Sequence, residues 1–247
     1  TLENMSTVEA AVSNAIDILV GNKKVDRIGN KSVGHVFYAI KDNARSEILY
    51  FKNSILHHFI VPWIINSAWV NLFNGEFKTE KDLAKHLLKL RDQLKFEFYL
   101  PTTAKTLVRA FRVISFSTGK QVYNLKDCMT LTPEELMKIG RDVGIFSRSH
   151  KYILENYFVV ALAIKLIYAE KENSFRMDKF LKKAREVFET ERSLGRVIRH
   201  PEAFTLPVIK NGLKYFENLE ILKNNLGDYV ISRVAKLDTE IVYLERE

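Results

Sequence analysis

Apolar and polar residues along this chain recur mostly with the spacing of amphipathic helices. Two stretches alternate as strands do instead: residues 25–40, around a Gly29-Asn30 turn, and the tail from Asp228 onward. The pattern predicts a mainly α fold, a helical domain with small β-hairpins near both ends. Residues 8–20 and 208–222 each form a helix followed by a turn and strands, so winged-helix-like helix–hairpin units are compatible with it. The helices are expected at residues 8–20, 45–73, 79–98, 103–116, 133–170, 174–192 and 206–219.

Short polar motifs predict where these helices begin and end. Ser6 and Glu9 have capping-box spacing, Thr79 and Asp82 start another helix, and Thr132 with Glu135 marks a further start. Pro62 should kink or divide the helix that it interrupts, and a break is expected near Ser147. The segment QVYNL, residues 121–125, has the composition of a short strand.

Composition narrows the class of protein without choosing a function. The 247 residues are 47% hydrophobic and 28% charged, which is typical of a folded chain. The single cysteine, Cys128, excludes an internal disulfide framework and a cysteine-rich metal site. A net charge of +8 favours an anionic partner: nucleic acid, phospholipid headgroups or an acidic carrier protein. Because the lysines and arginines are scattered, solvated helix faces are the favoured interpretation of that charge.

Two apolar stretches have about the length of a membrane span. Residues 54–73 include both His57 and His58 and are interrupted by Pro62, whereas residues 152–168 carry Glu155 and Lys165. Each polar group would need a partner inside a bilayer. We therefore expect buried core helices, with contact to a membrane surface left open. No secretory leader is expected at the start of the chain.

No histidine has the spacing of an acyltransferase dyad, in which an aspartate orients the imidazole as general base. None of the six histidines is followed by aspartate at the fifth position, and His150 is followed there by Glu155. His57 and His58 are adjacent and would point about 100° apart on a helix, which disfavours a shared metal. We interpret one as packed and the other as lying at a rim. The sequence thus predicts no catalytic residue, no metal and no cofactor in this chain.

The segment Tyr50-Phe51-Lys52-Asn53, followed by His57, resembles the aromatic–aromatic–Lys/Arg–Asn–x–x–x–His segment of membrane-bound glycerol-3-phosphate acyltransferases. Three further segments are similar to that family and occur in the same order: LRDQLKFEFYLP (90–101), LENYFVVALA (154–163) and HPEAFTLPVIKNGLKYFENLEIL (200–222). The chain departs from the family at Gln93, commonly proline there, and at Ser54, commonly asparagine.

The resemblance implies that residues 1–247 form a single C-terminal helical region of a longer, bacterial-type enzyme, with a sub-boundary near 124–132. The parent enzyme would transfer an acyl chain from acyl-CoA or acyl-carrier protein to glycerol 3-phosphate in phospholipid synthesis. Its catalytic His-Asp motif lies in the domain before this region. No role is carried over to Tyr50, Phe51, Lys52, Asn53 or His57.

The same resemblance implies a peripheral location at the cytoplasmic face of the inner membrane. The expected partners are the upstream catalytic domain, the acyl donor and an anionic membrane surface. Three alternatives stay open: a region of a dihydroxyacetone-phosphate acyltransferase, an independent scaffold with the family fold, and a winged-helix-type nucleic-acid module. The residues disfavour the last, because helix 8–20 contains Glu9 and Asp17 and no basic residue.

Overall fold

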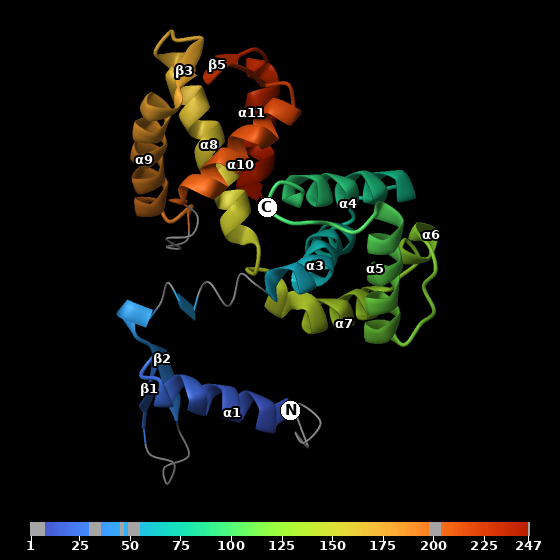
Figure 1. Ribbon diagram of the computed structural model, residues 1–247. Coiled ribbons are helices and arrows are strands. Elements are labelled where there is room, and N and C mark those ends of the chain that lie inside the picture. The colour runs from blue at the N-terminus through green and yellow to red at the C-terminus, as the bar shows by residue number, and fades with distance from the viewer. Residues whose placement is uncertain (1–7, 30–35, 45–46, 49–54, 198–203, 247) are drawn as a thin grey trace. The chain divides into compact units, whose positions relative to one another are not determined.

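The computed structural model describes residues 8–29, 36–44, 47–48, 55–197 and 204–246 (Figure 1). The chain forms two compact units, Thr1–Leu56 and His57–Glu247. The fold is mainly helical with a small antiparallel sheet in each unit, which confirms the predicted fold class.

The first unit is one helix followed by a hairpin. Helix α1 (Val8–Gly21) leads into strands β1 (Val25–Ile28) and β2 (Phe37–Ile40), which pair antiparallel with Val25 opposite Ile40. A short 3₁₀ turn, η2 (Asp42–Ala44), follows. The predicted helix and hairpin are confirmed. Ser6 of the expected capping box and Asn30 of the expected turn lie outside the described residues.

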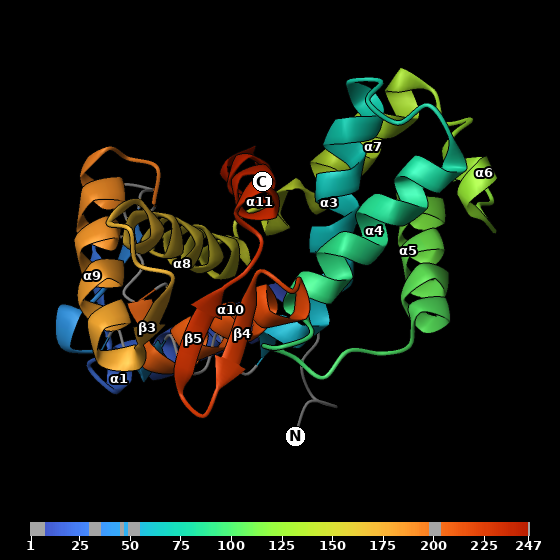
Figure 2. The ribbon, with the colours of Figure 1, turned by 90° about the horizontal axis from the view of Figure 1, so that it is seen from above.

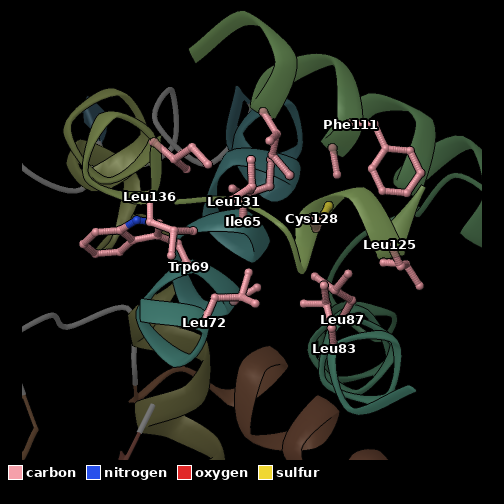
Figure 3. A pocket seen from close by; sticks show the side chains of 14 residues that line it. Ile65, Trp69, Leu72, Leu83, Leu87, Phe111, Leu125, Cys128, Leu131 and Leu136 are labelled. Atoms are coloured by element: carbon pink, nitrogen blue, oxygen red, sulfur yellow. The ribbon is translucent and has the colours of Figure 1, made fainter. Parts of the chain in front are cut away.

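The second unit begins with a bundle of helices around an apolar core, which we call the α3–α7 bundle. Its core contains Ile65, Leu83, Ala110, Leu136 and Ile139, each buried. A gap of about 20 Å³ remains at its centre, with apolar side chains from α3, α4, α5, α6 and α7 turned toward it (Figure 3). That volume holds little more than one water-sized probe. The elements are η3 (Leu56–Phe59), α3 (Ile60–Phe73), α4 (Glu80–Leu94), α5 (Thr103–Thr118), α6 (Leu125–Cys128), α7 (Pro133–Val143) and η4 (Gly144–Phe146).

Capping side chains begin four of these helices, Thr102 at α5 and reciprocal capping boxes at the other three. Thr79 and Asp82 form a reciprocal capping box at α4, and Thr132 and Glu135 form another at α7, both at predicted helix starts. Asn124 and Asp127 form a third at α6. Gly144–Phe146 and the residues before Lys151 provide the break expected near Ser147.

Pro62 does not divide α3, so that prediction is wrong. The helix begins at Ile60, which places Pro62 in its first turn. A helix leaves its first N–H groups without an intrahelical acceptor, so a proline there removes no hydrogen bond. The change from 3₁₀ to α geometry occurs at Phe59 and Ile60 instead.

The predicted strand at residues 121–125 is also wrong. Residues 121–124 are irregular, and α6 begins at Leu125. The N–H of Val122 donates to the Ser115 hydroxyl at 2.9 Å, and the Val122 carbonyl accepts from the same hydroxyl at 3.4 Å. Because a side chain of α5 satisfies the backbone of this segment, it forms no ladder with a neighbouring strand.

The remainder of the second unit surrounds one apolar helix, α8 (Lys151–Ala169), which packs against α9, α10 and α11 (Figure 1). Strands β3 (Ser174–Arg176), β5 (Asp228–Ile231) and β4 (Leu222–Asn225) form an antiparallel sheet in that order, and β4 and β5 lie side by side in Figure 2. From α8 to β5 the elements run helix–strand–helix–helix–strand–strand, the order of a winged helix. The helices are α9 (Met177–Ser193), α10 (Leu206–Asn218) and α11 (Val234–Arg246).

The tail after β5 is a helix, not the second of two strands that its alternation predicts. Leu237, Ile241 and Leu244 are buried, and their spacing of four and three residues places them on one helical face. That face packs against α8. Two smaller differences are that residues 174–176 form β3 before α9 begins, and that residues 222–225 add strand β4.

Candidate functional site

Of the five candidate positions that the sequence singles out, His57 alone lies among the described residues. Tyr50, Phe51, Lys52 and Asn53 lie outside the described residues. His57 and His58 belong to η3 and are both exposed, so the interpretation of one as packed is wrong. Their rings lie 3.8 Å apart between centroids.

Both histidines line a pocket of about 190 Å³, which we call the histidine–arginine pocket. Its other polar lining residues are Arg91 of α4, and Thr106 and Arg109 of α5. The apolar walls come from the start of α3, the connection between α4 and α5, and α5 itself; they are Ile60, Val61, Pro62, Leu100, Pro101 and Val113. The pocket thus joins three helices of the α3–α7 bundle.

Arg91 is held in place from two sides. One terminal nitrogen, Nη2, donates to the Pro101 carbonyl at 3.0 Å, and the other, Nη1, lies 3.2 Å from the Asp92 carboxylate. Its side chain is 21% exposed, so the guanidinium is partly desolvated. Arg109 is exposed and makes no ion pair with any residue that the structure describes. Together these side chains can provide several N–H donors to an anion.

His150 and Glu155 do not form a catalytic pair. The His150 ring is fully buried between Trp63 and Phe98, and its Nδ1 lies 2.8 Å from the Ser149 hydroxyl. Glu155 lines a separate pocket of about 150 Å³ with Lys151 and Arg196, and His150 is not part of its lining. A fully buried ring is out of reach of a substrate hydroxyl in solution.

His86 makes a contact that resembles a nucleophile and its base and that, unlike the buried contact of Ser149 with His150, lines a pocket. Its Nε2 lies 3.1 Å from the Ser67 hydroxyl and 3.4 Å from the Asn71 amide, in a pocket of about 700 Å³. Burial, with a smaller contribution from Lys89, lowers the pKa of His86 to about 4, so the ring is neutral at pH 7 and is a weaker base than a free imidazole. No carboxylate of the described residues is hydrogen-bonded to it, so the orienting third group of a triad has no counterpart there.

A buried polar network, which we call the polar junction, connects α4 and the residues just after it to α8, α10 and α11. Tyr157 donates to the Gln93 carbonyl at 3.1 Å, and Asn211 donates to the Glu97 carboxylate at 3.0 Å. Tyr215 donates to Glu240 at 2.6 Å. Lys89 forms an ion pair with the same Glu240 at 3.1 Å. These contacts hold the end of α4 against the helices around α8.

Burial sets the protonation of this junction. It raises the pKa of Glu97 to about 7, and the hydrogen bonds from Asn211 and Tyr157 offset only part of that rise. The phenol pKa of Tyr157 and of Tyr215 is also raised by burial, with a further rise from Glu97 and Glu240 respectively. Both tyrosines therefore stay protonated and act as donors.

The residues 8–29, 36–44, 47–48, 55–197 and 204–246 contain no cluster of three or more histidine, cysteine or carboxylate side chains suited to a metal ion. Helix α8 is long and apolar enough to cross a bilayer, yet 72% of its most apolar stretch is buried inside the protein. Cys128 is buried, and burial raises the pKa of its thiol to about 12.

The sequence alone did not predict which of these side chains lie close together. Arg91 is one of the scattered cations that the sequence assigns to solvated faces, and the pocket gives it a defined place beside His57. The contacts between His86 and Ser67, and between Glu97 and Asn211, join residues 19 and 114 positions apart. No local spacing signals such pairs, because they depend on how the helices pack.

The model of one family matches most of this chain. Residues 2–225 match the glycerol-3-phosphate acyltransferase C-terminal region. The chain belongs to that family, as the order of its four resembling segments predicts. No curated protein and no solved structure matches it.

Proposed function

We propose that this chain is a non-catalytic helical region that supports the acyl-transferring domain of a glycerol-3-phosphate acyltransferase. That domain would transfer an acyl chain from acyl-CoA or acyl-carrier protein to glycerol 3-phosphate. Membership of the C-terminal-region family supports a link to a catalytic domain. The histidines are consistent with this role: His150 is enclosed, and His86 is bonded to Ser67 and Asn71 rather than to a carboxylate.

The observation that carries the proposal is a set of exposed apolar side chains in the first unit. Ile28 and Phe37 lie opposite each other in the hairpin and share one of its faces, where they are 53% and 66% exposed. We take this exposed apolar pair as the contact point of an interaction site. The occupant that we propose is the catalytic domain of the same enzyme.

The proposed location is peripheral, at the cytoplasmic face of the inner membrane. Contact with anionic lipid is supported by the net charge of +8. The buried state of α8 supports a region that does not span the membrane through that helix. Dihydroxyacetone phosphate is the alternative acceptor for the parent enzyme.

Two measurements test the supporting role. The purified 247-residue chain is expected to show no acyl transfer to glycerol 3-phosphate from either donor. It is expected to bind a separately produced catalytic domain of the family, and Phe37→Ser should weaken that binding at least roughly ten-fold, as loss of a buried aromatic anchor does. Val242→Ser is the matched control, because Val242 lies on α11 and is 52% exposed.

Either of two results would contradict the proposal. One is turnover by the isolated chain. The other is equal binding of the catalytic domain by the Phe37→Ser and Val242→Ser variants. Circular dichroism of both variants shows that the fold is kept, so that a loss of binding is assigned to the surface.

A nucleic-acid-binding role is the second candidate, because the elements from α8 to β5 have the order of a winged helix. In such modules one helix enters the major groove. The corresponding helix, α10, exposes Lys210 and Lys214, but Asn218 at its end accepts from Lys95, next to α4. A salt-dependent shift of duplex DNA would support this role, and the absence of any shift at low salt would refute it.

A further inference from the structure

The histidine–arginine pocket combines positive charge, N–H donors and a size suited to a small anion. Two arginines and two histidines line it, and none of its lining residues is an aspartate or glutamate. Asp92, the ion-pair partner of Arg91, is not part of the lining. Arg109 makes no ion pair with the described residues, so the pocket keeps an uncompensated positive charge, which attracts anions from solution.

The arrangement of the donors favours a tetrahedral oxyanion. The hydrogen bond to Pro101 and the ion pair with Asp92 fix the plane of the Arg91 guanidinium, and Arg109 approaches from another helix. Planar guanidinium groups match the oxygens of phosphate in pairs. His57 and His58 add ring N–H donors at the same mouth, since even a neutral imidazole keeps one.

The end of α5 adds to this charge. Pro101 and Thr106, both lining the pocket, lie on either side of the amino-terminal turn of that 16-residue helix. The N–H of Lys105 donates to the Thr102 hydroxyl and that of Thr106 to the Thr102 carbonyl, so this turn adds the partial positive charge of a helix start rather than free donors. The volume of about 190 Å³ is below the roughly 300 Å³ at which drug-sized ligand sites begin, so it suits a headgroup rather than a whole cofactor.

We propose that the histidine–arginine pocket binds the phosphate group of a phosphate ester. Arg91 and Arg109 hold the phosphate oxygens, and His57 and His58 complete the donor set. The ester is either a small soluble molecule or the headgroup of a phospholipid, and both present the same phosphate chemistry. This inference does not depend on the proposed supporting role, because it concerns what the chain itself binds.

Calorimetric titration of the purified chain tests the proposal, with glycerol 3-phosphate as the soluble probe. Vesicles of phosphatidylcholine with and without phosphatidic acid provide the lipid probe. Arg109→Gln is the test variant, and Arg112→Gln is its matched control, since Arg112 is exposed on the same helix, loses the same charge and does not line the pocket. Thermal unfolding of both variants establishes that they fold alike.

Saturable binding of glycerol 3-phosphate is expected, weakened roughly ten-fold by Arg109→Gln and unchanged by Arg112→Gln, as loss of a hydrogen bond to a charged group predicts. Binding only to vesicles with phosphatidic acid, with the same difference between the variants, supports the proposal and assigns the ligand to a lipid headgroup.

Three outcomes overturn it: no binding to either probe, equal weakening by both variants, or no effect of Arg109→Gln. Equal weakening would show a diffuse surface charge rather than a site. None of these outcomes alters binding to the catalytic domain through Phe37, so failure here is distinguishable from failure of the supporting role.

Discussion

The core of the α3–α7 bundle and the polar junction differ in what holds them together. The bundle core consists of aliphatic side chains and Cys128 around a gap of about 20 Å³. The polar junction instead buries two tyrosines, a glutamine and the Glu240 carboxyl group, with Glu97 half-buried, all linked by hydrogen bonds. Apolar packing is strong but weakly directional, whereas a buried network is satisfied in only one arrangement. We infer that packing stabilises the bundle, while the junction decides how α4 meets α8, α10 and α11.

Truncating the apolar core is expected to have the largest effect. Leu83 is 2% exposed, and Leu83→Ala should lower the free energy of unfolding by about 3 kcal/mol, because it removes buried methyl groups and leaves a cavity. Urea unfolding measures the change. Leu88→Ala on the same helix is the control, since Leu88 is 41% exposed and should cost well under 1 kcal/mol. Similar losses for both variants would mean that this core does not carry the stability of the bundle.

The contribution of the polar junction to stability should depend on pH. The folded-state pKa of Glu97 is raised from 4.5 to about 7, so its contribution to stability is fully present below pH 4.5 and is lost as the pH rises through 7. Glu97→Gln should remove that dependence and leave the variant about 2 kcal/mol more stable than the parent chain above this window. Chemical unfolding at several pH values measures the difference between the two proteins.

His86 changes stability with pH in the opposite direction to Glu97. The effect of Glu97 is therefore measured as the difference between the parent chain and the variant. Its folded-state pKa is lowered from 6.5 to about 4, so stability is lost as the pH falls through this range. Both proteins share this loss, and subtraction cancels it. Parallel pH profiles for the parent chain and the Glu97→Gln variant would show that Glu97 is not buried as a neutral group.

Removing one hydroxyl from the junction should have the smallest effect. Tyr157→Phe keeps the ring stacked on Tyr215, with centroids 4.9 Å apart, but leaves the buried Gln93 carbonyl without this donor. The expected cost is about 1.5 kcal/mol. Tyr123→Phe is the control, because Tyr123 is 72% exposed. Urea unfolding compares the two, and equal stabilities would indicate that water replaces the lost donor.

The sequence predicted correctly those elements whose structure depends on residues that are neighbours along the chain. The helix starts at Thr79 and Thr132 and the hairpin at residues 25–40 depend on neighbouring residues and are found as predicted. The tail failed because its alternation fits a strand as well as a helix, and only packing against α8 selects the helix. Pro62 was misjudged because its effect depends on where α3 begins, which periodicity does not specify.

By itself the sequence determined the helical class, the family and the lack of a His-x₄-Asp motif in this chain, since each can be read along the chain. Only the tertiary structure decided that Arg91 and Arg109 meet His57 in one pocket, and that Glu97 lies among Tyr157 and Asn211. The physical reason is that charge and acidity depend on neighbours brought by packing from distant helices, and burial there changes the pKa of a group that the sequence shows only as a residue type.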